Sequence, residues 1–322
     1  MRGAVRLILP LVAANIAAWG LAYTIFHHSG VLMGAAFLAY TLGLRHAFDA
    51  DHIAAIDNVT RKLMQAGQRP VAAGLYFSLG HSAVVWLASI GIAVAVNTAC
   101  PPMEFLHRIG GTVGTGVSAL FLLGIAATNL VVLKGIVGAI RRQRRGETIE
   151  RKELDELLVP KGLYARLVRP VFRMVSKSRH MLIVGILFGL GFDTATEIGV
   201  LGISAVAAGN GLPIWYILIF PALFTAGMSL VDTLDSTFMS GAYGWAFVEP
   251  GRKLYYNLTI TFVSVVAALV VGGIEAMTLI PEDFWRPVQG VPGGLGYVIA
   301  ATLALLWAGW TLLHRGRVPR RG

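Results

Sequence analysis

The chain has 322 residues, of which 56% are hydrophobic and only 14% are charged. Soluble domains usually contain about 25% charged residues, so this composition excludes an ordinary water-soluble protein and also a disordered one. Lysine and arginine outnumber aspartate and glutamate by 27 to 17, which gives a net charge of +10. Cations gathered on one side of a membrane explain that charge without a nucleic-acid partner. The single cysteine, Cys100, excludes an intrachain disulfide framework and a metal site built on cysteines of this chain.

Long apolar runs predict eight transmembrane helices. Each run is long enough to cross about 30 Å of hydrocarbon as a helix. The runs lie near 5–26, 31–56, 71–96, 113–140, 181–208, 213–238, 254–274 and 294–313. We therefore predict an all-α, polytopic membrane protein in which residues 1–322 form a single transmembrane domain.

The basic residues predict how these helices are oriented. If both termini are cytoplasmic, the cytoplasmic segments include a loop with Arg61, Lys62 and Arg69 and a basic loop at about 141–180. The outer loops then keep few cations, which is what the positive-inside rule expects. We predict a multi-pass protein of the cytoplasmic (inner) membrane, with a short amphipathic helix near 150–156 on its inner face.

Ionisable side chains fall inside four of the predicted spans. Burying such groups in a membrane is costly, so each one is a functional candidate. The second span carries RHAFDADHI at 45–53, the third FSLGHS at 77–82, the fifth GFDTATE at 191–197 and the sixth GMSLVDTLD at 227–235.

Helical spacing gathers these side chains into stripes, because residues three or four apart share one face of a helix. Asp51 falls off its stripe if the second span is regular, which indicates either a supporting role or a distorted helix. The stripes consist of His46, Asp49 and His52, then Asp193 and Glu197, then Asp232 and Asp235.

The stripes and His81 fall at comparable depths, so we expect them to converge on one cavity. Imidazole and carboxylate donors suit nickel, cobalt or zinc better than copper(I). Structural explanations exist for single residues. Arg45 could form a salt bridge with Asp49, His81 could be a hydrogen-bonded interior histidine, and Asp193 with Glu197 could relay protons without a metal. These separate explanations do not account for ionisable groups buried in four helices at once.

Two segments of the chain are similar to each other. FSLGHSAVV at 77–85 resembles FTAGMSLVD at 224–232, and each follows an acid-bearing span. The offset of three spans reverses orientation in the membrane. Helices 2 and 3 are therefore predicted to form an inverted repeat with helices 5 and 6, an architecture found in transporters.

The four motifs resemble those of the nickel/cobalt transporter family of membrane permeases. The match includes the His-x4-Asp-His signature from His46 to His52, LGHSAVV at 79–85, LGFDTATE at 190–197 and GMSLVDTLD at 227–235. The resemblance implies eight helices, cytoplasmic termini and high-affinity uptake of Ni²⁺ or Co²⁺ by a secondary permease. It implies no prosthetic group and no ATPase subunit, with the metal ion as transported substrate.

The resemblance also implies roles for individual residues. His46, Asp51 and His52 would be essential for metal recognition, and Asn15 and Phe48 are candidates for tuning nickel against cobalt. Further residues would contribute to the site or the path, namely His81, Asp193, Glu197, Asp232 and Asp235.

Other classes of function remain open at this point. A membrane-embedded metalloenzyme could use the same ligands, although the chain has no HExxH motif and no candidate nucleophile near the histidines. A metal sensor could signal through the basic loop. A metal-binding component could also require a separate ATPase.

Overall fold

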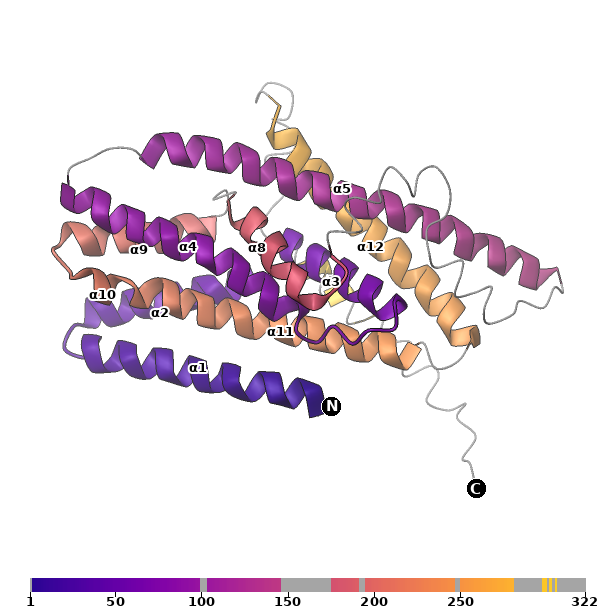
Figure 1. Ribbon diagram of the computed structural model, residues 1–322, viewed down its shortest axis with the longest axis horizontal. Coiled ribbons are helices and arrows are strands. Elements are labelled where there is room, and N and C mark those ends of the chain that lie inside the picture. Colours follow the sequence, from indigo (N-terminus) through magenta and orange to yellow (C-terminus); the bar gives the residue numbers. More distant parts are fainter. Residues whose placement is uncertain are drawn as a thin grey trace.

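The computed structural model describes residues 2–98, 103–145, 175–190, 195–246, 250–280, 297–299, 301–302 and 305 (Figure 1). The regular structure of this part of the chain is entirely helical, as predicted. Its elements are α1 (Arg2–Phe26), α2 (Gly30–His46), α3 (Ala50–Gln65), α4 (Ala73–Thr98), α5 (Met103–Arg144), the 3₁₀ helix η1 (Ser178–His180), α8 (Met181–Gly189), α9 (Ala195–Gly209), α10 (Ile214–Ile217), α11 (Ile219–Ala246) and α12 (Pro250–Thr278).

Long apolar helices make the chain a polytopic membrane protein. In the described ranges, 5 helical stretches are long and apolar enough to cross a membrane, and the bent pair α2–α3 makes a possible sixth. The 5 are Val5–Phe26, Ala73–Val96, Thr115–Arg142, Ile214–Gly244 and Thr261–Thr278. Most of the predicted eighth span, 294–313, and the predicted helix at 150–156 lie outside the described residues.

The second predicted span is not one continuous helix, in agreement with the distortion that the position of Asp51 left open. α2 ends at His46 and α3 begins at Ala50, with a bend of 49° between them. Asp49 has an extended backbone with φ −66° and ψ 146°, so its conformation cannot continue a helix. Residues 47–49 contain no proline or glycine, the residues that usually mark a helix break in a sequence.

α3 also continues beyond the predicted end of that span at 56. It extends to Gln65, and Arg61, which we expected in a cytoplasmic loop, is only 1% exposed. The polar stretch after Ile56 therefore lies inside the protein rather than outside it. The fifth predicted span, 181–208, similarly contains two shorter helices, α8 and α9, with the intervening 191–194 outside the described residues.

Two glycines allow the helices of the interior to approach closely. A side chain at Gly80 of α4 would overlap the backbone of α8 at Leu182, and one at Gly227 of α11 would overlap the backbone of α2 at Tyr40. Gly80 and Gly227 occupy corresponding positions in the two similar segments, 77–85 and 224–232. Gly80 packs against α8, which precedes α9, and Gly227 packs against α2, which precedes α3, so corresponding positions make corresponding contacts.

The remaining helices surround this centre. α1 packs on α11 and α2 at one margin, whereas α5 and α12 cross each other along the opposite side (Figure 1). α3 contacts both α11 and the α5–α12 pair. It therefore lies between the central helices and an outer wall of two helices.

Candidate metal centre

Three buried histidines meet where α2 gives way to α3. His46 is the last residue of α2, His52 lies in the first turn of α3, and His81 comes from the middle of α4. Their exposed fractions are 0%, 0% and 2%. One nitrogen from each ring lies within 4.8 Å of the other two. The break in the second span thus turns two residues of one motif toward a third residue from another helix.

His46 is held by oxygen atoms on one side of its ring. Its Nδ1 lies 2.9 Å from Asp49 Oδ2 and 2.9 Å from Thr196 Oγ1. A carboxylate at this position favours a proton on Nδ1, so the lone pair that can bind a metal is on Nε2. That Nε2 lies 2.9 Å from His81 Nε2.

A carboxylate of α11 contacts the Nδ1 of His52, as Asp49 contacts the Nδ1 of His46. His52 Nδ1 lies 3.4 Å from Asp232 Oδ2, and the Ser78 hydroxyl donates to the same oxygen at 2.7 Å. Its Nε2 is buried and has no hydrogen-bond partner in the part of the chain that the structure describes. A buried polar atom without a partner costs about 1–3 kcal/mol, so a ligand that satisfied Nε2 would be stabilising.

His81 contacts an acidic residue of α9. Its Nε2 lies 2.8 Å from Glu197 Oε1, and Glu197 is 1% exposed. His81 Nδ1 is buried without a partner among the described residues. The Nε2 atoms of His46 and His81 and the carboxylate of Glu197 therefore form a compact group of nitrogen and oxygen donors.

The geometry of this group fits a divalent transition metal. Two ligands at about 2.1 Å from a metal, at right angles to each other, are separated by about 3 Å, close to the 2.9 Å between His46 Nε2 and His81 Nε2. Square-planar and tetragonal arrangements of nitrogen and oxygen donors are typical of nickel(II).

Other predicted site residues lie around this group rather than in it. Asp51 is partly exposed in the first turn of α3, and Asp235 is partly exposed on α11, with its Oδ2 buried and without a partner in the described ranges. Asp193 lies outside the described residues. Asp49 bonds to His46, and within the described chain it forms no ion pair with Arg45, which is exposed.

The two selectivity candidates are placed at the margins of the centre. Asn15 of α1 is 7% exposed, and its Nδ2 donates to Leu11 O at 2.8 Å and to Ala226 O at 3.2 Å. Phe48 lies within the break, and its ring stacks on Tyr297 with centroids 5.0 Å apart. Asn15 therefore ties α1 to α11, and Phe48 packs on Tyr297.

Sequence reasoning missed two hydroxyl groups that orient the histidines. Thr196 contacts His46, and Ser78 contacts Asp232, the partner of His52. Both stand inside the motifs already singled out, at 191–197 and 77–82. Their small polar side chains within apolar helices were the available signal.

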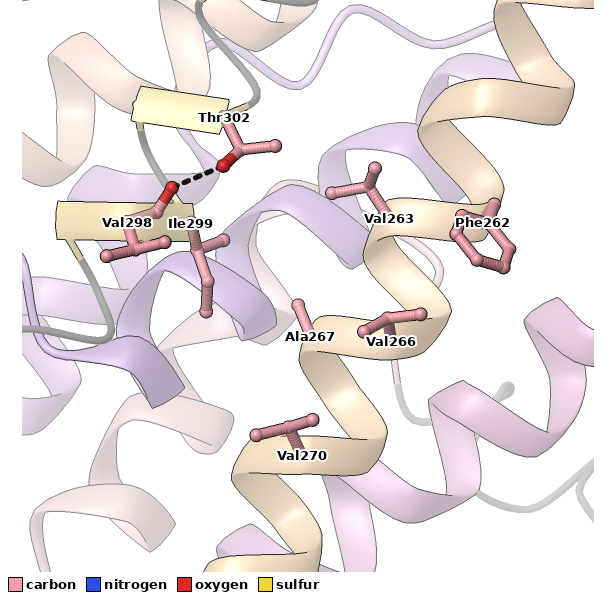
Figure 2. Close-up of a pocket in the computed structure, with 8 residues that line it drawn as sticks. All are labelled: Phe262, Val263, Val266, Ala267, Val270, Val298, Ile299 and Thr302. Carbon is pink, nitrogen blue, oxygen red and sulfur yellow. Dashed lines mark hydrogen bonds between the residues drawn. The ribbon is translucent and has the colours of Figure 1, made fainter. Parts of the chain in front are cut away.

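An apolar pocket elsewhere in the structure has a different character. It lies between α12 and the residues Val298, Ile299 and Thr302 (Figure 2). The hydroxyl of Thr302, the polar side chain among its lining residues, donates to Val298 O at 2.7 Å. This pocket offers a cation no free donor, unlike the histidine centre.

Comparison with known proteins bears directly on this centre. Residues 32–312 match the NicO family, which is described as high-affinity nickel-transport protein. The chain belongs to this family. NicO membership confirms the resemblance that the motifs carry and makes the chain a nickel/cobalt transporter rather than an enzyme.

NicO relatives match over most of their length. A high-affinity nickel transport protein of Cupriavidus necator is 52% identical over 95% of this chain and 90% of its own length. The nickel transporter NicT of Mycobacterium tuberculosis is 47% identical over 90% of this chain and 81% of its own. The cobalt transport protein NhlF of Rhodococcus rhodochrous is 40% identical over 91% of this chain and 86% of its own. No solved structure matches the chain.

Proposed function

We propose that this chain is a self-sufficient secondary permease that takes up Ni²⁺ or Co²⁺ through the histidine centre of His46, His52 and His81. The observation that carries the proposal is the buried Nε2 of His52, which has no partner among the described residues and lies beside the close pair His46–His81. Three convergent imidazoles in the interior of a membrane transporter give a dication the nitrogen donors that it prefers.

The acidic residues have distinct roles in this proposal. Asp49 and Asp232 hold the Nδ1 protons of His46 and His52, which keeps each Nε2 turned toward the cation. Glu197 supplies an oxygen donor next to His81, with which it makes a 2.8 Å contact. The remaining carboxylates line the path of the ion to and from the centre. They are Asp51, Asp193 and Asp235.

Selectivity between nickel and cobalt arises from the helices that support the centre. Asn15 fixes α1 against α11 one residue before the close-packed Gly227, and Phe48 stands in the break between two of the histidines. Changes at these positions shift the helices that carry the ligands and so alter the coordination angles. The nickel and cobalt specificities in the names of the relatives fit a centre that such small shifts can tune.

The proposed architecture has eight spans, cytoplasmic termini and an inverted repeat. The five long helices and the α2–α3 pair account for most of these spans, and α8 with α9 would supply another. The matching contacts of Gly80 and Gly227 support a repeat of α2–α4 with α8–α11. A site between inverted repeats can open to either side by rocking one repeat against the other.

The membrane potential is sufficient to drive this uptake. An inside-negative potential of 100 mV contributes about 2.3 kcal/mol per elementary charge, or about 4.6 kcal/mol for a dication. Uptake therefore requires no ATPase subunit, and proton coupling is optional.

The test is uptake of radiolabelled Ni²⁺ and Co²⁺, each in competition with the other, by transport-deficient cells that produce this chain alone. The wild-type chain should accumulate metal, and His52→Ala should not. His180→Ala should behave like wild type, because among the described residues the His180 side chain bonds only to nearby Ser176. Accumulation by His52→Ala at the wild-type rate would contradict the proposed centre. A correctly inserted wild-type chain that accumulates neither metal would indicate a required partner.

A further inference from the structure

A second buried polar cluster lies further along α3. We call it the Arg61 cluster. With a rise of 1.5 Å per residue, Arg61 lies about 13 Å beyond His52 along the helix axis. The cluster joins α3 to three other helices. Its members are Asp57, Asn58 and Arg61 of α3, Asn129 of α5, Tyr243 of α11, and Thr261 and Ser264 of α12.

Arg61 and Asn58 form one half of this cluster. The Arg61 guanidinium donates to Thr261 Oγ1 at 2.6 Å and to Asn58 Oδ1 at 3.2 Å. Asn129 donates to the same Asn58 oxygen at 2.5 Å. Arg61 is 1% exposed and forms no ion pair with a carboxylate in the described part of the chain. A full positive charge is thus held inside the protein by neutral groups of α3 and α12.

Asp57 forms the other half. Its Oδ1 accepts a hydrogen bond from Tyr243 at 2.6 Å and its Oδ2 accepts one from Ser264 at 2.7 Å. Asp57 and Arg61 are four residues apart and therefore lie on the same face of α3. Their opposite charges make the cluster neutral as a whole, which lowers the cost of burying it.

The cluster lies on the side of the histidine centre that faces the basic loop. Lys62 directly follows Arg61, and its Nζ donates to Val175 O at 2.6 Å. Gln68 Nε2 donates to Ser176 O at 2.9 Å. Val175 and Ser176 follow directly on the segment 141–174, which holds 10 of the 27 lysines and arginines. In the proposed orientation this is the cytoplasmic side.

These positions give the cluster a role in the passage of the ion. We propose that the Arg61 cluster is the inner gate of the permease, closed here, and that a cation leaves the histidine centre for the cytoplasm only when α3 separates from α5 and α12. This proposal rests on the function and orientation proposed above.

The physics of the cluster suits a gate. The closed cluster fills the space between α3, α5, α11 and α12 with buried, hydrogen-bonded side chains, so it is a steric barrier to the ion. Its contacts are hydrogen bonds, which water can replace with a net change of only about 1 kcal/mol each. A close-packed apolar contact between the same helices would be costlier to open to water.

α3 links this gate to the histidine centre. The same 16-residue helix carries His52 in its first turn and Arg61 near its other end, and it begins at the bend after His46. A rotation of α3 about residues 47–49 would therefore move the metal ligand and the gate together. Binding of the cation by His52 can in this way bias the gate.

A reporter cysteine tests the gate. Ala126 of α5 is 1% exposed and lies three residues before Asn129 on the same helix face, toward the histidine side of the cluster. In a Cys100→Ser background, Ala126→Cys would be reached by a maleimide from the cytoplasmic side only through an open gate. Ala93→Cys of α4, also at a buried alanine, is the matched control for general loosening of the fold.

The measurement is the rate of maleimide labelling in inside-out and right-side-out membrane vesicles, without nickel, for the intact cluster and two variants. Removing a buried hydrogen-bonding partner costs about 1–3 kcal/mol, so Arg61→Gln should raise labelling of Ala126→Cys about tenfold in inside-out vesicles. Thr261→Val keeps the shape of its side chain and should raise it about threefold. Labelling of Ala93→Cys should not change.

Unchanged labelling of Ala126→Cys in both variants, or an equal rise at both reporters, would overturn the gate and leave the cluster as a structural contact. A rise in right-side-out vesicles alone would also overturn it, because the cluster would then face the outside. These readouts need no metal. A failure of the gate is therefore distinguishable from a failure of the proposed function, which appears as absent nickel binding or uptake by the unmodified chain.

Discussion

The two ends of α3 bury polar side chains in opposite ways. At its start, His52 Nε2 has no partner among the described residues. At its end, both carboxylate oxygens of Asp57 and both terminal nitrogens of Arg61 have partners. The first arrangement leaves a metal-ligating nitrogen without a partner, whereas the second pairs every polar atom of Asp57 and Arg61 except Arg61 Nε among the described residues. Under the proposed function, the difference separates groups that bind the ion from groups that bind one another.

This comparison predicts opposite effects on stability and on binding. A buried donor or acceptor without a partner costs free energy, so removing one should not destabilise the metal-free protein. Removing one member of a satisfied cluster leaves its partners buried and unpaired, which is strongly destabilising. Variants at the two ends of α3 should therefore separate metal binding from folding.

The largest effect is expected at the histidine centre. His46→Ala and His52→Ala should each lower nickel uptake at least about 100-fold, because a direct ligand should matter at least as much as its supporting groups, whose loss costs 10- to 100-fold. Insertion into the membrane should persist, since a span without the imidazole is more apolar. Uptake assays normalised to the amount of protein in the membrane measure this. Loss of the protein from the membrane in both variants would contradict the assignment.

A large but different effect is expected at the other end of α3. Arg61→Ala should destabilise the protein by about 3 kcal/mol, because it leaves Asp57 as an uncompensated buried charge. The affinity of purified protein for nickel should stay within a few-fold of wild type. Thermal unfolding in detergent and nickel titration calorimetry measure the two quantities. An Arg61→Ala protein of normal stability that no longer binds nickel would reverse the comparison.

An intermediate effect is expected for the group that orients His52. Asp232→Asn removes the charge that holds the Nδ1 proton and should weaken nickel binding about 10- to 100-fold. Titration calorimetry with purified protein is the measurement. Asp57→Asn, the same chemical change at the other end of α3, is the matched control and should affect stability more than nickel affinity.

A smaller effect is expected for the hydroxyl that supports Asp232. Ser78→Ala removes one hydrogen bond, worth about 1 kcal/mol, so nickel affinity should fall only about fivefold. The Asp232→Asn, Ser78→Ala double variant should be no weaker than Asp232→Asn alone, because the hydroxyl acts through that carboxylate. Fully additive losses would show that Ser78 acts on the cation by another route.

Much of the centre could be predicted from the sequence. Polar motifs within apolar runs contain His46, His52 and His81. Ionisable residues are costly in a membrane interior, so those that occur there are usually functional. The all-α class followed from the apolar runs themselves. These signals are local in the sequence, which is why they were readable.

What the sequence did not reveal depends on contacts between distant segments. The break at 47–49 has no proline or glycine and forms where His46, Asp49 and Thr196 meet. The burial of Arg61 depends on Thr261, 200 positions away along the chain. A hydropathy window assigns Arg61 to a loop because it averages only neighbouring residues. It contains no information on Thr261, whose hydroxyl accepts the hydrogen bond from Arg61.

The most direct test of the central claim is nickel X-ray absorption spectroscopy on purified protein loaded with one equivalent of Ni²⁺. We expect three imidazole nitrogens at about 2.1 Å, one fewer in His52→Ala, and an unchanged spectrum in Arg61→Gln. A nickel environment made of oxygen ligands alone, or one that His52→Ala leaves unaltered, would contradict the account.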